Sequence, residues 1–308
     1  MKLKFGVFIL SVILVLVLSG CSGRTISGKA HTLPEQKLEL KANGEQVFSI
    51  TLEPSQIGIT YDFAQYENTR FDHDIDAFIF YPKDVSPEKS YPVIHLVHGG
   101  TEDIYDDKNM AFFIPFALRA AERGFVAVYP NVRHLSYKDK GRTDLLAGIQ
   151  FVKESDKFIA DKQGCFGSSL GNRPVWSVVT TNPGQCDAYV GVYPAWDPKN
   201  RDFFSGDEQM AKVEAKTFFT IGTEDMFLKN VVFYENNLKV ANPELDYYQT
   251  YHEDSDHGFY FATGKTHKVK GVEFTLPLDP NWEEAQIQTL EFAEYALKGK
   301  RAPSWWGK

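Results

Sequence analysis

One serine lies between two glycines in a pattern that suits a nucleophile. Residues 167–171 read Gly-Ser-Ser-Leu-Gly and satisfy the pattern G-x-S-x-G, with Ser169 at the centre. Glycines on both sides let the chain turn sharply from a strand into a helix and leave the serine hydroxyl exposed at the turn. The five residues alone also fit an ordinary strand-to-helix turn, so the rest of the sequence must decide.

An acid and a histidine follow this serine, each just after a run of strand-forming residues. Asp225 follows the apolar run 217–221, and His257 lies in a polar loop after 247–251. A histidine that an acid holds in place can take the proton of a serine hydroxyl, which then attacks an acyl carbon. We predict that Ser169 is the nucleophile, His257 the base and Asp225 the residue that orients the imidazole.

Three other residues compete for two of these roles. Glu224 adjoins Asp225, and Asp197 follows an earlier apolar run at which the acid could also lie; His252 is close to His257. The loop positions that such a site requires favour Asp225 and His257.

The elements that position these residues alternate along the chain. Apolar runs predict strands at 78–81, 93–97, 125–129, 164–166, 188–193, 217–221 and 247–251, and helical patterns lie at 110–123, 144–154, 173–180, 208–213, 228–239 and 282–297. Such alternation favours a mostly parallel sheet covered by helices on both faces, an α/β fold. Residues 38–52 alternate around Asn43-Gly44, which predicts an antiparallel hairpin added at an edge. Segment 262–276 carries no recognisable motif.

Over roughly residues 75–297 the chain resembles the α/β-hydrolase superfamily, and within it the dienelactone-hydrolase-like and prolyl-oligopeptidase-like serine esterases. The likeness rests on the His98-Gly-Gly loop, the segment 167–171, the turn 222–225 and the loop 256–259. It implies an α/β-hydrolase fold and an oxyanion hole formed by the backbone N–H groups of Leu170 and Gly100. Dienelactone hydrolases use a cysteine nucleophile where this chain has Ser169, so lactone hydrolysis is not implied.

The amino terminus resembles a bacterial lipoprotein signal peptide. Basic residues at 2 and 4 precede an apolar stretch at 5–18, which is short for a transmembrane helix, and Leu18-Ser-Gly-Cys21 follows it. The resemblance implies a signal peptide at 1–20, lipid on Cys21, a tether at 21–36 and one hydrolase domain at 37–308. The protein would then be held in the cell envelope, outside the cytoplasm. An uncleaved anchor or a plain secretory signal is the alternative.

The net charge and the aromatic residues limit which classes of partner and substrate the protein can bind. Removal of residues 1–20 would take the formal net charge from -8 to -10, because Lys2 and Lys4 are lost. An acidic chain argues against nucleic acid as a partner and favours neutral or weakly cationic substrates. Aromatic residues in loops after strands could form a wall for a sugar or an aromatic acyl group, or most of them could simply pack in the core; they are Trp196, Phe203, Phe204, Phe259, Tyr260 and Phe261.

The remaining cysteines and acids suggest no metal or cofactor. Cys165 and Cys186 lie on neighbouring predicted strands and fit either a disulfide or two buried thiols. An acidic loop at 102–107 fits a solvated loop better than a calcium site. Three function classes stay open: an ester hydrolase, a peptidase of prolyl-oligopeptidase-like type, and a non-catalytic binding lipoprotein.

Overall fold

The computed structural model describes residues 36–100, 103–133, 139–196 and 207–306. All of them belong to the part of the chain from Glu35 to Lys308. The predicted signal peptide and its lipidation residue, Cys21, lie outside the described residues.

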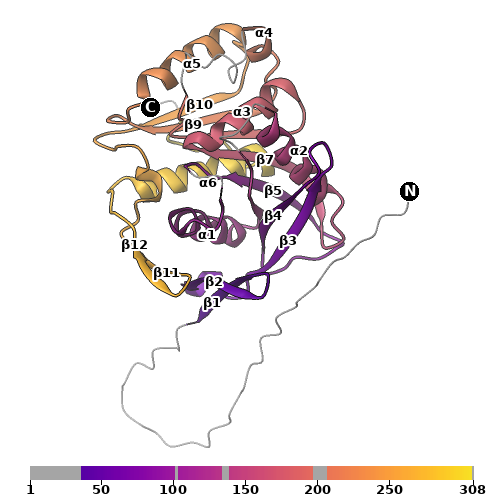
Figure 1. Cartoon of the computed structure of the whole chain (residues 1–308). Coiled ribbons are helices and arrows are strands. Elements are labelled where there is room, and N and C mark those ends of the chain that lie inside the picture. Colours follow the sequence, from indigo (N-terminus) through magenta and orange to yellow (C-terminus); the bar gives the residue numbers. More distant parts are fainter. Residues whose placement is uncertain (1–35, 101–102, 134–138, 197–206, 307–308) are drawn as a thin grey trace, which may run out of the picture. The chain divides into compact units, whose positions relative to one another are not determined.

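An eight-stranded sheet forms the centre of this part (Figure 1). Its strands, in spatial order, are β10 (Tyr247–His252), β9 (Lys216–Gly222), β8 (Ala188–Val192), β7 (Ile159–Ser168), β5 (Ser90–Val97), β6 (Val126–Pro130), β4 (His73–Tyr81) and β3 (Thr60–Asn68). The strands from β10 to β6 pair in parallel, and β4 is antiparallel to both of its neighbours. The predicted mostly parallel sheet is confirmed.

Strands β6 and β8 are buried along their whole length, as expected where helices cover both faces of a parallel sheet. The helices are α1 (Asp107–Glu122), α2 (Lys140–Lys153), α3 (Asn172–Thr181), α4 (Asp207–Met210), α5 (Leu228–Ala241) and α6 (Trp282–Lys298), with short 3₁₀ turns η1 (Pro54–Gln56), η2 (Ser169–Gly171) and η3 (Phe259–Phe261). Helices α1 and α6 lie on one face of the sheet, and α2 and α3 lie on the other (Figure 1).

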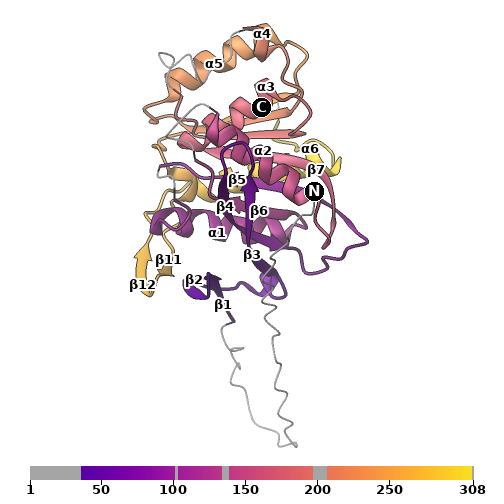
Figure 2. The same ribbon diagram turned by 45° about the vertical axis from the view of Figure 1, so that its right-hand side comes forward.

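The amino-terminal hairpin is confirmed, but its expected place as an edge of the main sheet is wrong. Strands β1 (Lys37–Ala42) and β2 (Glu45–Thr51) pair around Asn43 and Gly44, both of which have positive φ. They join β11 (Thr266–Val269) and β12 (Val272–Thr275) in a separate four-stranded sheet, because β2 pairs with β11. Figures 1 and 2 show this small sheet beside α1.

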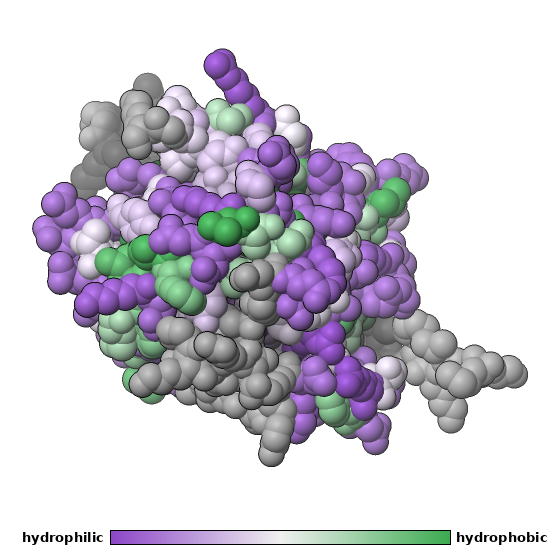
Figure 3. Space-filling view, turned by 90° about the horizontal axis from the view of Figure 1, so that it is seen from above, coloured by the Kyte–Doolittle hydropathy of each residue, from purple (hydrophilic) through white to green (hydrophobic). Residues whose placement is uncertain are grey.

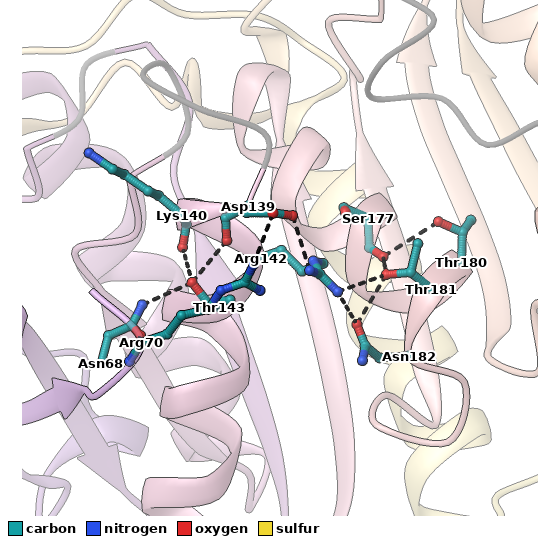
Figure 4. A network of polar contacts seen from close by, with 10 residues as sticks. All are labelled: Asn68, Arg70, Asp139, Lys140, Arg142, Thr143, Ser177, Thr180, Thr181 and Asn182. Atoms are coloured by element: carbon teal, nitrogen blue, oxygen red, sulfur yellow. Dashed lines mark hydrogen bonds and ion pairs between the residues drawn. The ribbon is translucent and has the colours of Figure 1, made fainter. Parts of the chain in front are cut away.

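A polar network ties α3 to α2 and α2 to β3 (Figure 4). Arg142 donates to Oδ1 of Asn182 and to Oδ1 of Asp139, both at 3.0 Å. Asn68, at the end of β3, donates to Oγ1 of Thr143 at 2.9 Å. Because α3 starts directly after the turn that holds Ser169, these bonds help to fix the helix that supports this turn.

Helix α5 lies on the sheet through one face and presents the other to solvent. Val231, Tyr234 and Leu238 are buried, whereas Phe233 and Val240 are exposed. Figure 3, which looks down on this side of the domain, shows apolar groups set among hydrophilic ones. Within the described ranges, no helix combines the length and the apolar composition needed to cross a membrane.

Candidate active site

Ser169 occupies a sharp turn between β7 and α3. Its φ is +47°, a left-handed backbone conformation that residues other than glycine seldom adopt. A Cβ added at Gly167 would lie 2.7 Å from Cα of Asn172, and one at Gly171 would lie 2.3 Å from the carbonyl oxygen of His98. Both glycines are therefore required for the close packing of this turn, as the sequence pattern predicts.

His257 and Asp225 stand in line with this serine. Oγ of Ser169 lies 2.8 Å from Nε2 of His257, and Nδ1 of the same imidazole lies 2.8 Å from Oδ2 of Asp225. The Asp225 carboxylate has no exposed surface, and its Oδ1 accepts the N–H of Phe227 at 2.8 Å. The structure thus brings together the three residues that the sequence singles out, in the order serine, histidine, acid.

The acid and the histidine come from neighbouring strand ends. Asp225 lies in the turn after β9, and His257 lies in the loop after β10, next to β9 in the sheet. Gly222 lets the two segments meet, because a Cβ there would lie 2.0 Å from the carbonyl oxygen of Ser255. The parallel pairing of β9 and β10 therefore sets the distance between acid and base.

Two aromatic rings flank the imidazole of His257. The centroid of Tyr193 lies 4.7 Å away and that of Phe227 lies 5.3 Å away, both roughly edge to face. Tyr193 also has a left-handed backbone, with φ of +32°, directly after β8. Burial raises the pKa of the Tyr193 hydroxyl well above its ordinary value. Tyr193 lies in no sequence motif, and its place directly after a buried strand is the one signal that points to it.

The predicted oxyanion donors lie around the same serine. Leu170 follows Ser169 in the turn η2 and is half-buried. The loop after β5 approaches closely, since a Cβ at Gly99 would lie 2.7 Å from Cβ of Ser169. Gly100 follows with φ of +73° and is exposed. Leu170 and Gly100 thus belong to the two segments that meet at Ser169.

Two of the three competing residues, Glu224 and His252, are described by the structure. Glu224 is exposed. His252 is buried and its Nε2 lies 2.9 Å from Oγ1 of Thr220; burial lowers its pKa to about 4. Asp197 lies outside the described residues.

Of the aromatic residues that could form a wall, those that the structure describes pack in the core. Trp196, Phe259, Tyr260 and Phe261 are all at most 3% exposed. The ring of Phe261 packs 4.9 Å from that of Phe112 in α1, whereas the ring of Trp196 packs 5.4 Å from that of Trp176 in α3. Phe203 and Phe204 lie outside the described residues.

The acidic loop is occupied by structural contacts. Asp106 caps α1 by accepting two backbone N–H groups, Asp103 accepts the N–H of Tyr105 at 2.7 Å, and Asp107 pairs with Lys270 at 3.5 Å. Across the residues that the structure describes, no three His, Cys, Asp or Glu side chains gather in a way that could hold a metal ion.

The two remaining cysteines are bonded to each other in the structure. Cys165 of β7 and Cys186, just before β8, form a disulfide with a Cα–Cα distance of 5.8 Å. The bond ties β7, the strand that leads to Ser169, to the segment just before β8.

Comparison with known proteins identifies a distant sequence relative and solved structures of the same fold. No protein-family model matches the chain. It is 29% identical over 111 residues to dipeptidyl-peptidase 5 of Aspergillus oryzae, a match that covers 32% of this chain and 15% of that protein. The chain therefore spans well under a fifth of the length of the curated relatives that it matches.

Solved structures share the architecture over most of the chain. Thermogutta terrifontis esterase 2, phosphorylated by paraoxon, has a TM-score of 0.60 and 16% identity, with 81% of this chain and 97% of the esterase covered. A Klebsiella pneumoniae protein assigned as a dienelactone hydrolase has a TM-score of 0.59 and 14% identity, covering 79% and 99%. The chain has the α/β-hydrolase fold, which confirms the predicted fold class.

Proposed function

We propose that this protein is a serine hydrolase that cleaves carboxylic esters. The observation that carries the proposal is the bonded line from Ser169 Oγ through the His257 imidazole to the buried Asp225 carboxylate. Ser169 would attack the ester carbonyl while His257 takes its proton. The proton then passes to the leaving alkoxide, and water releases the acyl group from Ser169 by the reverse route.

The oxyanion of each tetrahedral intermediate needs donors that are already in place. The N–H groups of Leu170 and Gly100 would supply them, because both belong to segments that meet at Ser169. Loss of one such donor typically lowers the rate by about 10² to 10³. Asp225 would keep the imidazole in the useful tautomer and stabilise its charged form.

A fluorophosphonate probe tests this proposal directly. It should label the parent protein at Ser169 and should not label Ser169→Ala. Hydrolysis of a panel of p-nitrophenyl esters should follow the same pattern. An unlabelled parent that binds esters without turning them over would instead support a binding lipoprotein.

A peptidase is the second candidate, favoured by the match to dipeptidyl-peptidase 5. Aminoacyl p-nitroanilides separate the two activities, because an amide needs a protonated leaving nitrogen more strongly than an activated ester needs a protonated oxygen. Faster turnover of the anilides than of matched esters would assign the site to peptides. We expect the esters, small or carbohydrate-linked, to be the better substrates, and we expect no nucleic-acid partner.

The cell envelope is the proposed location. The support is Leu18-Ser-Gly-Cys21 after a short apolar stretch. Cys21→Ala should abolish acylation and normal processing while the esterase activity remains. An unchanged amino-terminal mass together with unchanged detergent partitioning would contradict the lipid anchor.

A further inference from the structure

Ser255, a buried residue in the loop of His257, forms hydrogen bonds to two neighbouring segments. The carbonyl oxygen of Ser255 accepts the N–H of Glu224 at 3.0 Å, in the same turn that holds Asp225. On the other side, Oγ of Ser255 donates to Oδ1 of Asp279 at 3.0 Å. Ser255 has no exposed surface. It therefore joins the turn of the acid, the loop of the base and the segment that leads into α6.

The partners of this serine are themselves held in place. Asn281 donates through Nδ2 to Oγ of Ser255 at 2.9 Å and to the carbonyl oxygen of Glu253 at 2.8 Å. Asp279 accepts the backbone N–H of Asn281 at 2.9 Å. Helix α6 begins at the next residue, Trp282. The side chains of Asp279 and Asn281 therefore bond the loop of His257 to the start of a helix.

The loop of His257 needs such support. It contains left-handed backbone on both sides of the histidine, at Asp254 with φ of +56° and at Gly258 with φ of +92°. Local preference of the chain disfavours this conformation at Asp254, so surrounding contacts must maintain it.

We propose that Ser255, Asp279 and Asn281 are positioning residues that keep His257 between Ser169 and Asp225. The inference rests on the proposed hydrolase function. Without the hydroxyl of Ser255, its carbonyl still holds the turn of Asp225, but the loop loses its bonds to the start of α6. The imidazole then departs from the line of proton transfer, and a misplacement of about 1 Å can cost about 10²-fold in rate.

The effect should fall on turnover rather than on binding. Ser255→Ala should lower kcat on p-nitrophenyl acetate by about 10- to 100-fold, with KM changed less than about 2-fold, since no group that holds substrate is altered. The rate of fluorophosphonate labelling should fall by the same factor. Asp279→Asn keeps an acceptor oxygen for Ser255 and should stay within about 3-fold of the parent, whereas Asp279→Ala should behave like Ser255→Ala.

Thr217→Val supplies the matched control. Thr217 is fully buried, and its Oγ1 donates to the carbonyl oxygen of Ala215 at 2.9 Å, near the start of β9 and away from the site. The Thr217→Val variant should lose about as much thermal stability as Ser255→Ala and should keep the kcat of the parent. The inference is overturned if Ser255→Ala keeps the parent kcat, or if Thr217→Val loses as much. A parent without ester turnover and without labelling would overturn the proposed function, and this inference with it.

Discussion

The two sheets of the domain are assembled from the chain in opposite ways. The parallel strands of the main sheet alternate with the helices that cover them, so each strand end delivers a loop to the same edge. Ser169, Asp225 and His257 come from three such loops. The small sheet joins β2 to β11 from distant parts of the chain and pairs only antiparallel strands. Its hairpins provide packing beside α1 and no comparable gathering of loops.

This contrast assigns different consequences to substitutions in the two sheets. Changes at the carboxyl edge of the main sheet should affect turnover, whereas changes in the small sheet should affect stability alone.

The largest expected effect is at the edge of the main sheet. Ser169→Ala and His257→Ala should each remove nearly all ester hydrolysis, and the double variant should be scarcely worse, because the residues act as a unit. Asp225→Asn should lower kcat by about 10⁴, since the imidazole loses its tautomer and its counter-charge. Steady-state kinetics and circular dichroism together separate this loss from unfolding.

Variants of the competing residues provide the control. Glu224→Gln and His252→Ala should be milder than the corresponding triad variants, as should Asp197→Asn. Parent-like turnover by Ser169→Ala would refute the nucleophile. A severe Asp197→Asn beside a mild Asp225→Asn would move the acid to the earlier strand.

The next largest effect belongs to the small sheet. Phe48 of β2 is 1% exposed and packs against the core. Phe48→Ala should reduce the free energy of unfolding by about 3 to 5 kcal/mol, the usual cost of removing a buried aromatic ring. Urea titration measures this cost, and kcat per folded molecule should be unchanged. Val272→Ala, at a position 65% exposed in β12, should cost less than about 0.5 kcal/mol. A loss of kcat in folded Phe48→Ala would break the contrast.

The sequence signals of the candidate site are local. Gly167 and Gly171 mark the turn of Ser169, and both glycines are required by contacts within a few ångströms. Helices α5 and α6 begin at the predicted residues, since their apolar periodicity starts there.

The missed features depend on partners far away in the chain. Strand β3 pairs with β4 along its whole length, yet it lies at an edge, is partly exposed and shows no apolar run. Strand β11 pairs with its neighbour β12 and also with β2, which lies far away in the chain. Phe261 was expected to line the site, but the packing of α1 decides its burial. The left-handed backbone of Tyr193, with φ of +32°, likewise has no short motif that signals it.

Acid should weaken both sheets through buried histidines. Burial lowers the pKa of His95, on β5, and of His267, on β11, from 6.5 to about 4. The folded protein keeps both neutral, while the unfolded chain takes up protons below about pH 6.5. Stability is therefore present above this pH and is lost as the pH falls towards 4, by at most about 1.4 kcal/mol per pH unit for each histidine.

Urea titrations at several pH values test this linkage. His95→Gln preserves a donor for Oε1 of Gln163, which lies 2.8 Å from Nε2 of His95, and should reduce the slope of unfolding free energy against pH. His267→Gln should reduce this slope by a similar amount, and the protein should still unfold in a single transition. A separate, earlier transition that only His267→Gln alters would mean that the small sheet unfolds independently.

The smallest effect concerns the ion pair that joins the two regions. Nζ of Lys270, in the turn between β11 and β12, lies 3.5 Å from Oδ1 of Asp107 at the start of α1, and both side chains are about half exposed. Solvent weakens such pairs, so Lys270→Ala should cost less than about 1 kcal/mol, and less again at high salt. Lys268→Ala, on the same hairpin and also exposed, is the control for loss of a surface lysine. If Lys270→Ala alone cost as much as Phe48→Ala, the ion pair rather than the buried apolar side chains would hold the small sheet to α1.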